Sequence, residues 1–114
     1  MAITQKRLGG PSQLTTSSTS YYTVGSGVTT IVKQIILTNT TGSAKTATVR
    51  LVPSGGSDSS AVDILSAVTL AANETLTFNC SMVMNYTGGA GDSLKALASS
   101  DTSVNITIFG IEES

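Results

Sequence analysis

The chain has 114 residues and a formal net charge of -1, with 6 Lys plus Arg against 7 Asp plus Glu. That length suits one small domain with a single core, and it excludes an enzyme built around a cleft between two domains. Only 11% of the residues are charged, against about 25% in an average domain. The composition therefore offers no basic patch for nucleic acid or for an anionic membrane.

The residue types favour an all-β domain. Ser and Thr together account for 35 of the 114 residues, alongside 11 Gly and 2 Pro. Thr favours strands, whereas Ser and Gly favour turns. Val, Ile and Leu are numerous enough for a core, while the helix formers Glu, Lys and Gln are scarce. We therefore expect a small antiparallel β-sandwich.

The chain has no His and no second Cys, and it therefore lacks the residues on which most catalytic sites depend. The chain has no His, which excludes a Ser-His-Asp triad and removes the commonest general base and metal ligand. Cys80 is the only cysteine, so no disulfide can form within the chain. We expect no enzyme, no catalytic residues, no cofactor and no metal site. The opening residues lack the apolar run of a secretory signal, so the chain is expected to be made in the cytoplasm.

The first 20 residues look different from the rest. They contain Gly9-Gly10-Pro11 followed by the low-complexity stretch 12–20. Such a segment offers little to bury and predicts an extended N-terminal arm over residues 1–20. Residues 21–114 are then predicted to form a single β-sandwich domain. The larger apolar residues of the arm are Ile3, Leu8 and Leu14.

The clearest strand is predicted over Thr29–Thr38. Strict alternation puts Ile31, Lys33, Ile35 and Leu37 on one face, and Val32, Gln34 and Ile36 on the other. Neither face is polar, so one of them must contact something other than solvent. A second strand is predicted over Ala44–Val52, and the turn Asn39–Ser43 between the two strands predicts a hairpin with a longer loop.

The remainder alternates apolar runs with turn residues. An exposed loop is expected over Pro53–Ser60, and a tight turn at Gly88–Gly91. Cys80 shares a strand face with Leu76 and Phe78, which predicts that it lies in the core. Seven or eight strands without a helix fit a jelly-roll-like sandwich with three to five strands in each sheet. The later strands are predicted over Asp63–Leu70, Thr75–Cys80, Ser93–Ala98 and Val104–Ile111.

Possible ligand sites are weak in this sequence. The acidic residues, mostly in turns, are expected to solvate loops or accept backbone hydrogen bonds rather than to form a catalytic pair. Residues 57–60 with Asp63 could offer oxygen ligands to calcium, but their spacing is not that of an EF-hand. Tyr21-Tyr22 is expected to pack at the core or its rim rather than to stack on a sugar. The acidic residues are Asp58, Asp63, Glu74, Asp92, Asp101, Glu112 and Glu113.

The order of motifs along the whole chain resembles that of a known group of proteins. Lys6-Arg7-Leu8-Gly9 comes first, and the motifs that follow are the strand 30–40, the strand and loop 49–56, the turn 70–76 and the strand 104–110. This order is similar to that of small β-sandwich virion proteins of tailed bacteriophages, which include head decoration (cement) proteins and tail-associated proteins. These motifs mark turns and strands and include no catalytic site.

The resemblance implies a non-enzymatic structural protein of a virion, made in the host cytoplasm. Its first implied function is capsid decoration on the outer surface of the particle, where the protein bridges and stabilises major capsid protein subunits. The implied partners are the major capsid protein or another virion protein, together with self-association, and include neither nucleic acid nor a membrane. A tail or fibre-associated protein is the alternative, and a carbohydrate-binding module, disfavoured by the lack of Trp, comes third.

Overall fold

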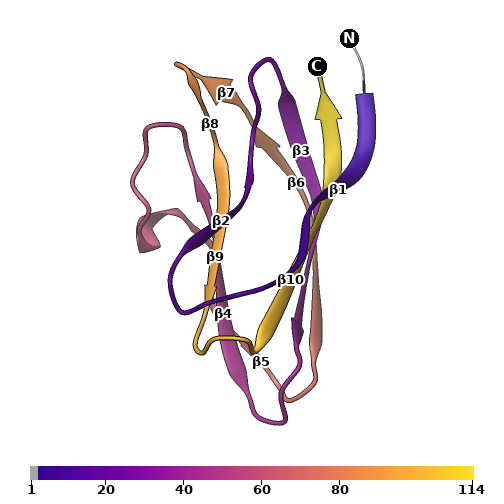
Figure 1. Cartoon of the computed structure of the whole chain (residues 1–114), viewed down its shortest axis with the longest axis vertical. Coiled ribbons are helices and arrows are strands. Elements are labelled where there is room, and N and C mark those ends of the chain that lie inside the picture. The colour runs from indigo at the N-terminus through magenta and orange to yellow at the C-terminus, as the bar shows by residue number, and fades with distance from the viewer. Residues whose placement is uncertain (1–2) are drawn as a thin grey trace.

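A computed structural model, which describes residues 3–114, shows two antiparallel sheets packed face to face (Figure 1). The first, sheet A, has the strand order β1-β10-β3-β6, and the second, sheet B, has the order β2-β9-β4-β5. These orders are those of a jelly roll, as predicted. Sheet A consists of β1 (Ile3–Gln13), β10 (Val104–Glu113), β3 (Thr29–Asn39) and β6 (Thr75–Met84). Sheet B consists of β2 (Thr19–Thr23), β9 (Ser93–Ala98), β4 (Lys45–Val52) and β5 (Asp63–Leu70).

Three short elements complete the described part of the structure. A single turn of 3-10 helix, η1 (Ser60–Val62), precedes β5, and β7 (Tyr86–Thr87) pairs with β8 (Ala90–Gly91). Gly88 and Gly89 join these two short strands with φ angles of +66° and +87°. Glycine adopts the left-handed conformation without steric cost, and the two-residue connection between the paired strands confirms the expected tight turn.

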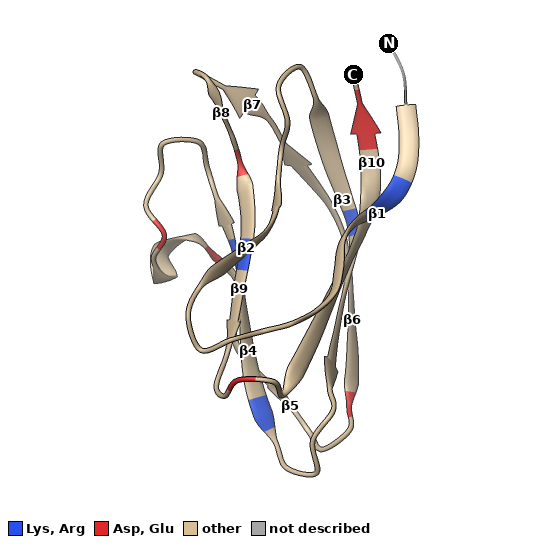
Figure 2. Cartoon of the chain, viewed as in Figure 1, with Lys and Arg blue, Asp and Glu red and all other residues tan. Residues whose placement is uncertain are grey.

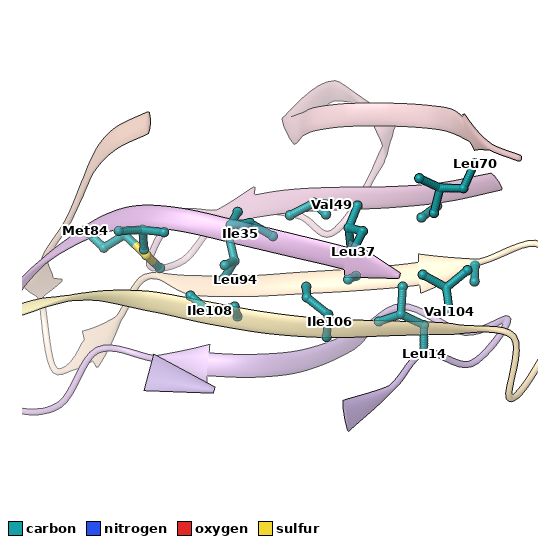
Figure 3. Close-up of a cluster of buried hydrophobic side chains, with 14 of the residues drawn as sticks. Leu14, Ile35, Leu37, Val49, Leu70, Met84, Leu94, Val104, Ile106 and Ile108 are labelled. Carbon is teal, nitrogen blue, oxygen red and sulfur yellow. The ribbon is translucent and has the colours of Figure 1, made fainter. Parts of the chain in front are cut away.

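The core lies between the sheets and is built by alternate side chains of both (Figure 3). Alternate residues of β9 and β10 point inward, and Cys80 lies half-buried at the margin of the core. Burial of apolar surface on this scale stabilises the fold. The buried cluster comprises Leu14, Val24, Val32, Ile35, Leu37, Ala47, Val49, Leu70, Met84, Leu94, Ala96, Ala98, Val104, Ile106 and Ile108.

The faces predicted for β3 are wrong. Val32, Ile35 and Leu37 are all fully buried, whereas Ile31 and Ile36 lie on the opposite face. Strict alternation fails because the register between β3 and β10 shifts at Lys33, where one extra residue forms a β-bulge. Because of the bulge, the residues before Lys33 and the residues after it no longer share one alternation of inward and outward side chains.

The hairpin predicted between residues 29–38 and 44–52 is also wrong, because β3 and β4 belong to different sheets. Asn39 holds the crossing at the end of β3. Its buried amide donates to the carbonyl oxygens of Ser43 (2.8 Å), Leu70 (3.1 Å) and Ala71 (3.1 Å), while its Oδ1 accepts from Thr41 N–H (2.9 Å). A short connection between two sheets therefore has the same turn-like composition as a hairpin.

The predicted arm is corrected for the residues that the structure describes. Residues 1–2 lie outside them, but residues 3–13 form β1, which pairs with β10, and Leu14 is fully buried in the core. The glycines suit this close packing, since a Cβ at Gly9 would lie 2.6 Å from the Tyr21 carbonyl oxygen. Figure 1 shows the chain crossing from β1 in one sheet to β2 in the other.

Candidate interaction surfaces

The acidic residues of the turns have structural partners. Asp92, Asp101 and Glu74 each accept hydrogen bonds from backbone N–H groups of neighbouring turns, at 2.7–3.0 Å. A carboxylate bonded in this way fixes the turn. Glu113 is exposed at the end of β10.

The outer face of sheet B carries a network of ion pairs. Arg50 Nε donates to Asp63 at 2.7 Å, and Arg50 Nη1 donates to Asp58 at 3.0 Å. Lys95 Nζ lies 3.7 Å from Asp58, and the Ser18 hydroxyl donates to Asp58 at 3.1 Å. The Ser18 hydrogen bond, followed by Arg50 and Lys95, lowers the pKa of Asp58. The network therefore ties the 53–62 segment to the sheet.

The same network uses the two acids that could have held calcium. Asp58 and Asp63 both face the Arg50 guanidinium, whose charge repels a cation. Within residues 3–114, no group of three or more His, Cys, Asp or Glu side chains is placed to bind a metal ion.

The tyrosine doublet packs inward, as expected. Tyr21 and Tyr22 both contact the core, and the Tyr22 hydroxyl bonds to the Thr30 hydroxyl (2.6 Å) and to Glu112 (2.5 Å). Lys6 Nζ lies 3.0 Å from the other oxygen of Glu112. Burial, together with the bond to Glu112, raises the pKa of Tyr22 to about 12, and the bonds from Tyr22 and Lys6 lower the pKa of Glu112. These groups join the two sheets at one end of the sandwich.

Apolar side chains lie in register across the outer face of sheet A. Ile111 pairs with Ile31, and Ile31 pairs with Val83 of β6, so the three side chains cross the sheet side by side. Val83 is 54% exposed. Phe109 and Ile36 extend the patch along β10 and β3 on the same face, and both are half-buried. We call these five residues the apolar row.

A shallow groove of about 500 Å³ adjoins the apolar row and is rimmed by cations. It is lined by three of the chain's six Lys and Arg residues, Lys6, Arg7 and Lys33, which Figure 2 shows in blue on β1 and β3. Lys33 Nζ donates to the Ser81 hydroxyl at 3.0 Å, whereas Arg7 forms no ion pair with any described residue. The surface therefore combines an apolar floor with positive charge.

Sequence reasoning missed most of this surface. In the sequence, Lys6-Arg7 stands out as the first motif of the resemblance to virion proteins and as a basic pair within the predicted arm, and Phe109 and Ile111 only as members of a strand. One signal did point to it, because the strand at 29–38 is apolar on both faces. The structure identifies the second apolar face as the one directed away from the core.

Comparisons with known proteins support the fold. No protein-family model and no curated protein sequence matches the chain. A solved structure of Bacillus endospore appendages, described as a novel family of disulfide-linked pili, superposes with a TM-score of 0.58 at 11% identity, over 98% of this chain and 88% of that one. A chain from the structure of infectious bursal disease virus, Gx strain, superposes with a TM-score of 0.53 at 10% identity.

The viral match covers 97% of this chain but only 32% of the viral chain, so this protein spans about a third of that chain's length. At such low identity both matches establish a shared fold and no more. Across the part of the chain that the structure describes, no helix is long and apolar enough to cross a membrane.

Proposed function

We propose that this chain is a non-enzymatic structural protein of a phage virion, and specifically a capsid decoration protein that bridges and stabilises major capsid protein subunits. The observation that carries the proposal is the outer face of sheet A, where the apolar row lies beside the cations Arg7 and Lys33. An exposed apolar patch with a polar rim is typical of a protein-binding surface. The partner surface would be apolar at its centre and acidic at its margin.

The surface suits repeated weak attachment. Each copy offers a small apolar area, and cations at its margin add orientation and partner choice more than affinity. Across a shell lattice, where copies also contact one another, many modest contacts add up to strong binding. Such binding would hold neighbouring shell subunits together through non-covalent contacts alone.

The structural comparisons support an assembly role in general terms. The two similar structures are of endospore pili and of a virus, both of which are built from repeated subunits. A tail or fibre-associated protein is the alternative, because the same small sandwich could occupy either place. A carbohydrate-binding module is less favoured, since the chain has no Trp and the rings of Tyr21 and Tyr22 pack against the core.

Copy number in the particle tests the proposal. Particles from the source culture are separated on a density gradient, and this chain is quantified against the major shell protein by mass spectrometry. A ratio near one, or a simple fraction of one, is the expected result. A few copies per particle would favour the tail instead, and absence from the particles would overturn a virion function altogether.

A further inference from the structure

Three of the four edge strands in this sandwich are protected against pairing with another chain. β1 carries Lys6, Arg7 and Pro11 and two register shifts, and β2 has only five residues. β5 has an irregularity between Leu65 and Val68, with Ala67 in a left-handed conformation at φ +46°. Charge, proline, bulges and shortness are the usual devices that keep an edge from adding a strand.

The fourth edge strand, β6, lacks most of these devices. Its ten residues, Thr75–Met84, include no charged residue and no proline. Within the described chain, its backbone-to-backbone hydrogen bonds go to β3 alone, so its other side is uncovered. One register shift occurs at Cys80 and Ser81, opposite Lys33, but residues 75–79 pair regularly with β3.

We propose that β6 pairs antiparallel with β6 of a second copy of this chain, which joins the two sheets A into one continuous sheet. The partner edge is also β6 because the other three edges are protected. A two-fold axis between identical strands gives a closed dimer, whereas pairing between unlike edges would give an open chain of subunits. Backbone hydrogen bonds would supply the contact, as in other cases of strand addition.

The size of the edge agrees with a dimer. Ten residues of strand span about 33 Å, and a second sheet lies about 10 Å away. Sheet B ends in β5 on the side where sheet A ends in β6, and half-buried Ile64, Leu65, Leu76 and Phe78 pack there against the core. The edges of two sheets packed about 10 Å apart together form a contact strip roughly 20 Å wide. Pairing along this strip would bury about 660 Å² per copy, or about 1,300 Å² in total, which reaches the range of specific interfaces.

The pairing would also orient the apolar rows. Neighbouring strands of one continuous sheet keep their outer faces on the same side. Val83, on the outer face of β6, would then bring the apolar row of one copy close to that of the other. In the proposed function a dimer would thus present two docking surfaces to two neighbouring shell sites, although the pairing itself does not depend on that function.

Sedimentation velocity of the full chain over a wide range of concentration tests the pairing. Wild type is expected to dimerise, and Thr77→Lys, which adds a charge to the exposed face of β6, is expected to weaken the dimer by at least about tenfold. The matched control is Thr4→Lys on β1, at the opposite edge of sheet A, which should leave the dimer intact. Circular dichroism verifies that each variant is folded, and Thr75→Lys replaces Thr77→Lys if the latter misfolds.

Three results would overturn the pairing: a monomer at every concentration, a dimer that Thr77→Lys and Thr75→Lys leave unchanged, or a dimer that Thr4→Lys weakens equally. The copy-number measurement on particles is separate from this one. Failure to dimerise therefore overturns the pairing alone, and absence from particles overturns the proposed function alone.

Discussion

The outer faces of the two sheets differ in how their side chains are satisfied. On sheet B, Arg50 and Lys95 are paired with Asp58 and Asp63, and the 53–62 segment is tied to the strands. On sheet A, Val83 is exposed, the other residues of the apolar row are half-buried, and the Arg7 guanidinium forms no ion pair within the described chain. Sheet B therefore completes its charged contacts within the described chain, whereas the outer face of sheet A is the one on which we propose that a partner docks.

The largest expected effect is on the free energy of unfolding, and it differs between the inner and outer faces of sheet A on the single strand β3. Ile35→Ala removes a fully buried side chain and should lower the free energy of unfolding by about 2–5 kcal/mol. Ile36→Ala, on the outer face of the same strand, should cost about 1 kcal/mol or less. Urea denaturation of both variants measures the two losses. Equal losses would mean that the apolar row is part of the core and not a docking surface.

Charge reversal compares the two outer faces directly. Lys33→Glu on sheet A should weaken binding to particles by about tenfold, because it places an acid beside the proposed acidic margin of the partner. Lys95→Glu on β9 makes the same change on the outer face of sheet B and should leave binding unchanged. Co-sedimentation with particles stripped of the protein measures both. A loss of binding by Lys95→Glu alone would assign docking to sheet B.

Loss of the ion pairs that hold the 53–60 loop on sheet B should change the protease sensitivity of that loop and not the binding surface of sheet A. Arg50→Ala removes the guanidinium that holds Asp58 and Asp63, so the 53–60 loop should be cut by a protease several times faster. Particle binding should remain unchanged. Limited proteolysis followed by mass spectrometry locates the cut, and Lys45→Glu serves as a control for a general loss of charge. Unchanged cleavage would show that the loop does not depend on the ion pairs.

Acid should reproduce that release in the wild type. The pKa of Asp58 is lowered in the folded protein, so its contribution to stability is complete above its ordinary pKa of 3.8 and is lost as the pH falls through the lowered value. Faster cleavage of the loop is therefore expected only below about pH 4. An acid-active protease makes the measurement, and Asp58→Asn should be cut rapidly at every pH. Release near neutral pH in the wild type would contradict this prediction.

The smallest expected effect concerns the contact between the two sheets at Tyr22. Its pKa is raised to about 12, so its contribution to stability is complete below pH 10 and is lost as the pH rises from 10 to 12. An absorbance titration should show a tyrosine that ionises near pH 12, and Tyr22→Phe should remove that step. The melting temperature of the variant should then depend less on pH between 10 and 12. A late step that persists in Tyr22→Phe would assign it to another tyrosine.

The positions of most strands could be predicted because they depend on local sequence patterns. The strands at 29–38, 63–70 and 93–98 are found within a residue or two of their expected bounds, since alternation and turn residues are local properties. The partners of these strands could not be predicted in the same way. The connection after Asn39 looks like a hairpin loop, but it crosses between sheets, and Asn39 bonds there to the carbonyl oxygens of Ser43, before β4, and of Leu70, at the end of β5.

The candidate surface was less predictable than the fold. Its residues come from β1, β3, β6 and β10, which are far apart in sequence and meet only through sheet pairing. The β-bulge at Lys33 also changes which Ile side chains face outward, and no local pattern marks that bulge. Gly9 and Gly10 suggested a loose arm because glycine is common in loops, whereas here they allow the backbone to pack closely against neighbouring strands.

The sequence by itself determined an all-β domain without His-based chemistry, because residue composition and alternation act through local propensity and through the presence or absence of reactive groups. Tertiary structure alone decided that β1 belongs to the sandwich, that the apolar row is continuous and that β6 is the unprotected edge. The physical reason is that strand pairing is non-local. Which side chains become neighbours depends on register and sheet order, and both are set by packing of the whole core.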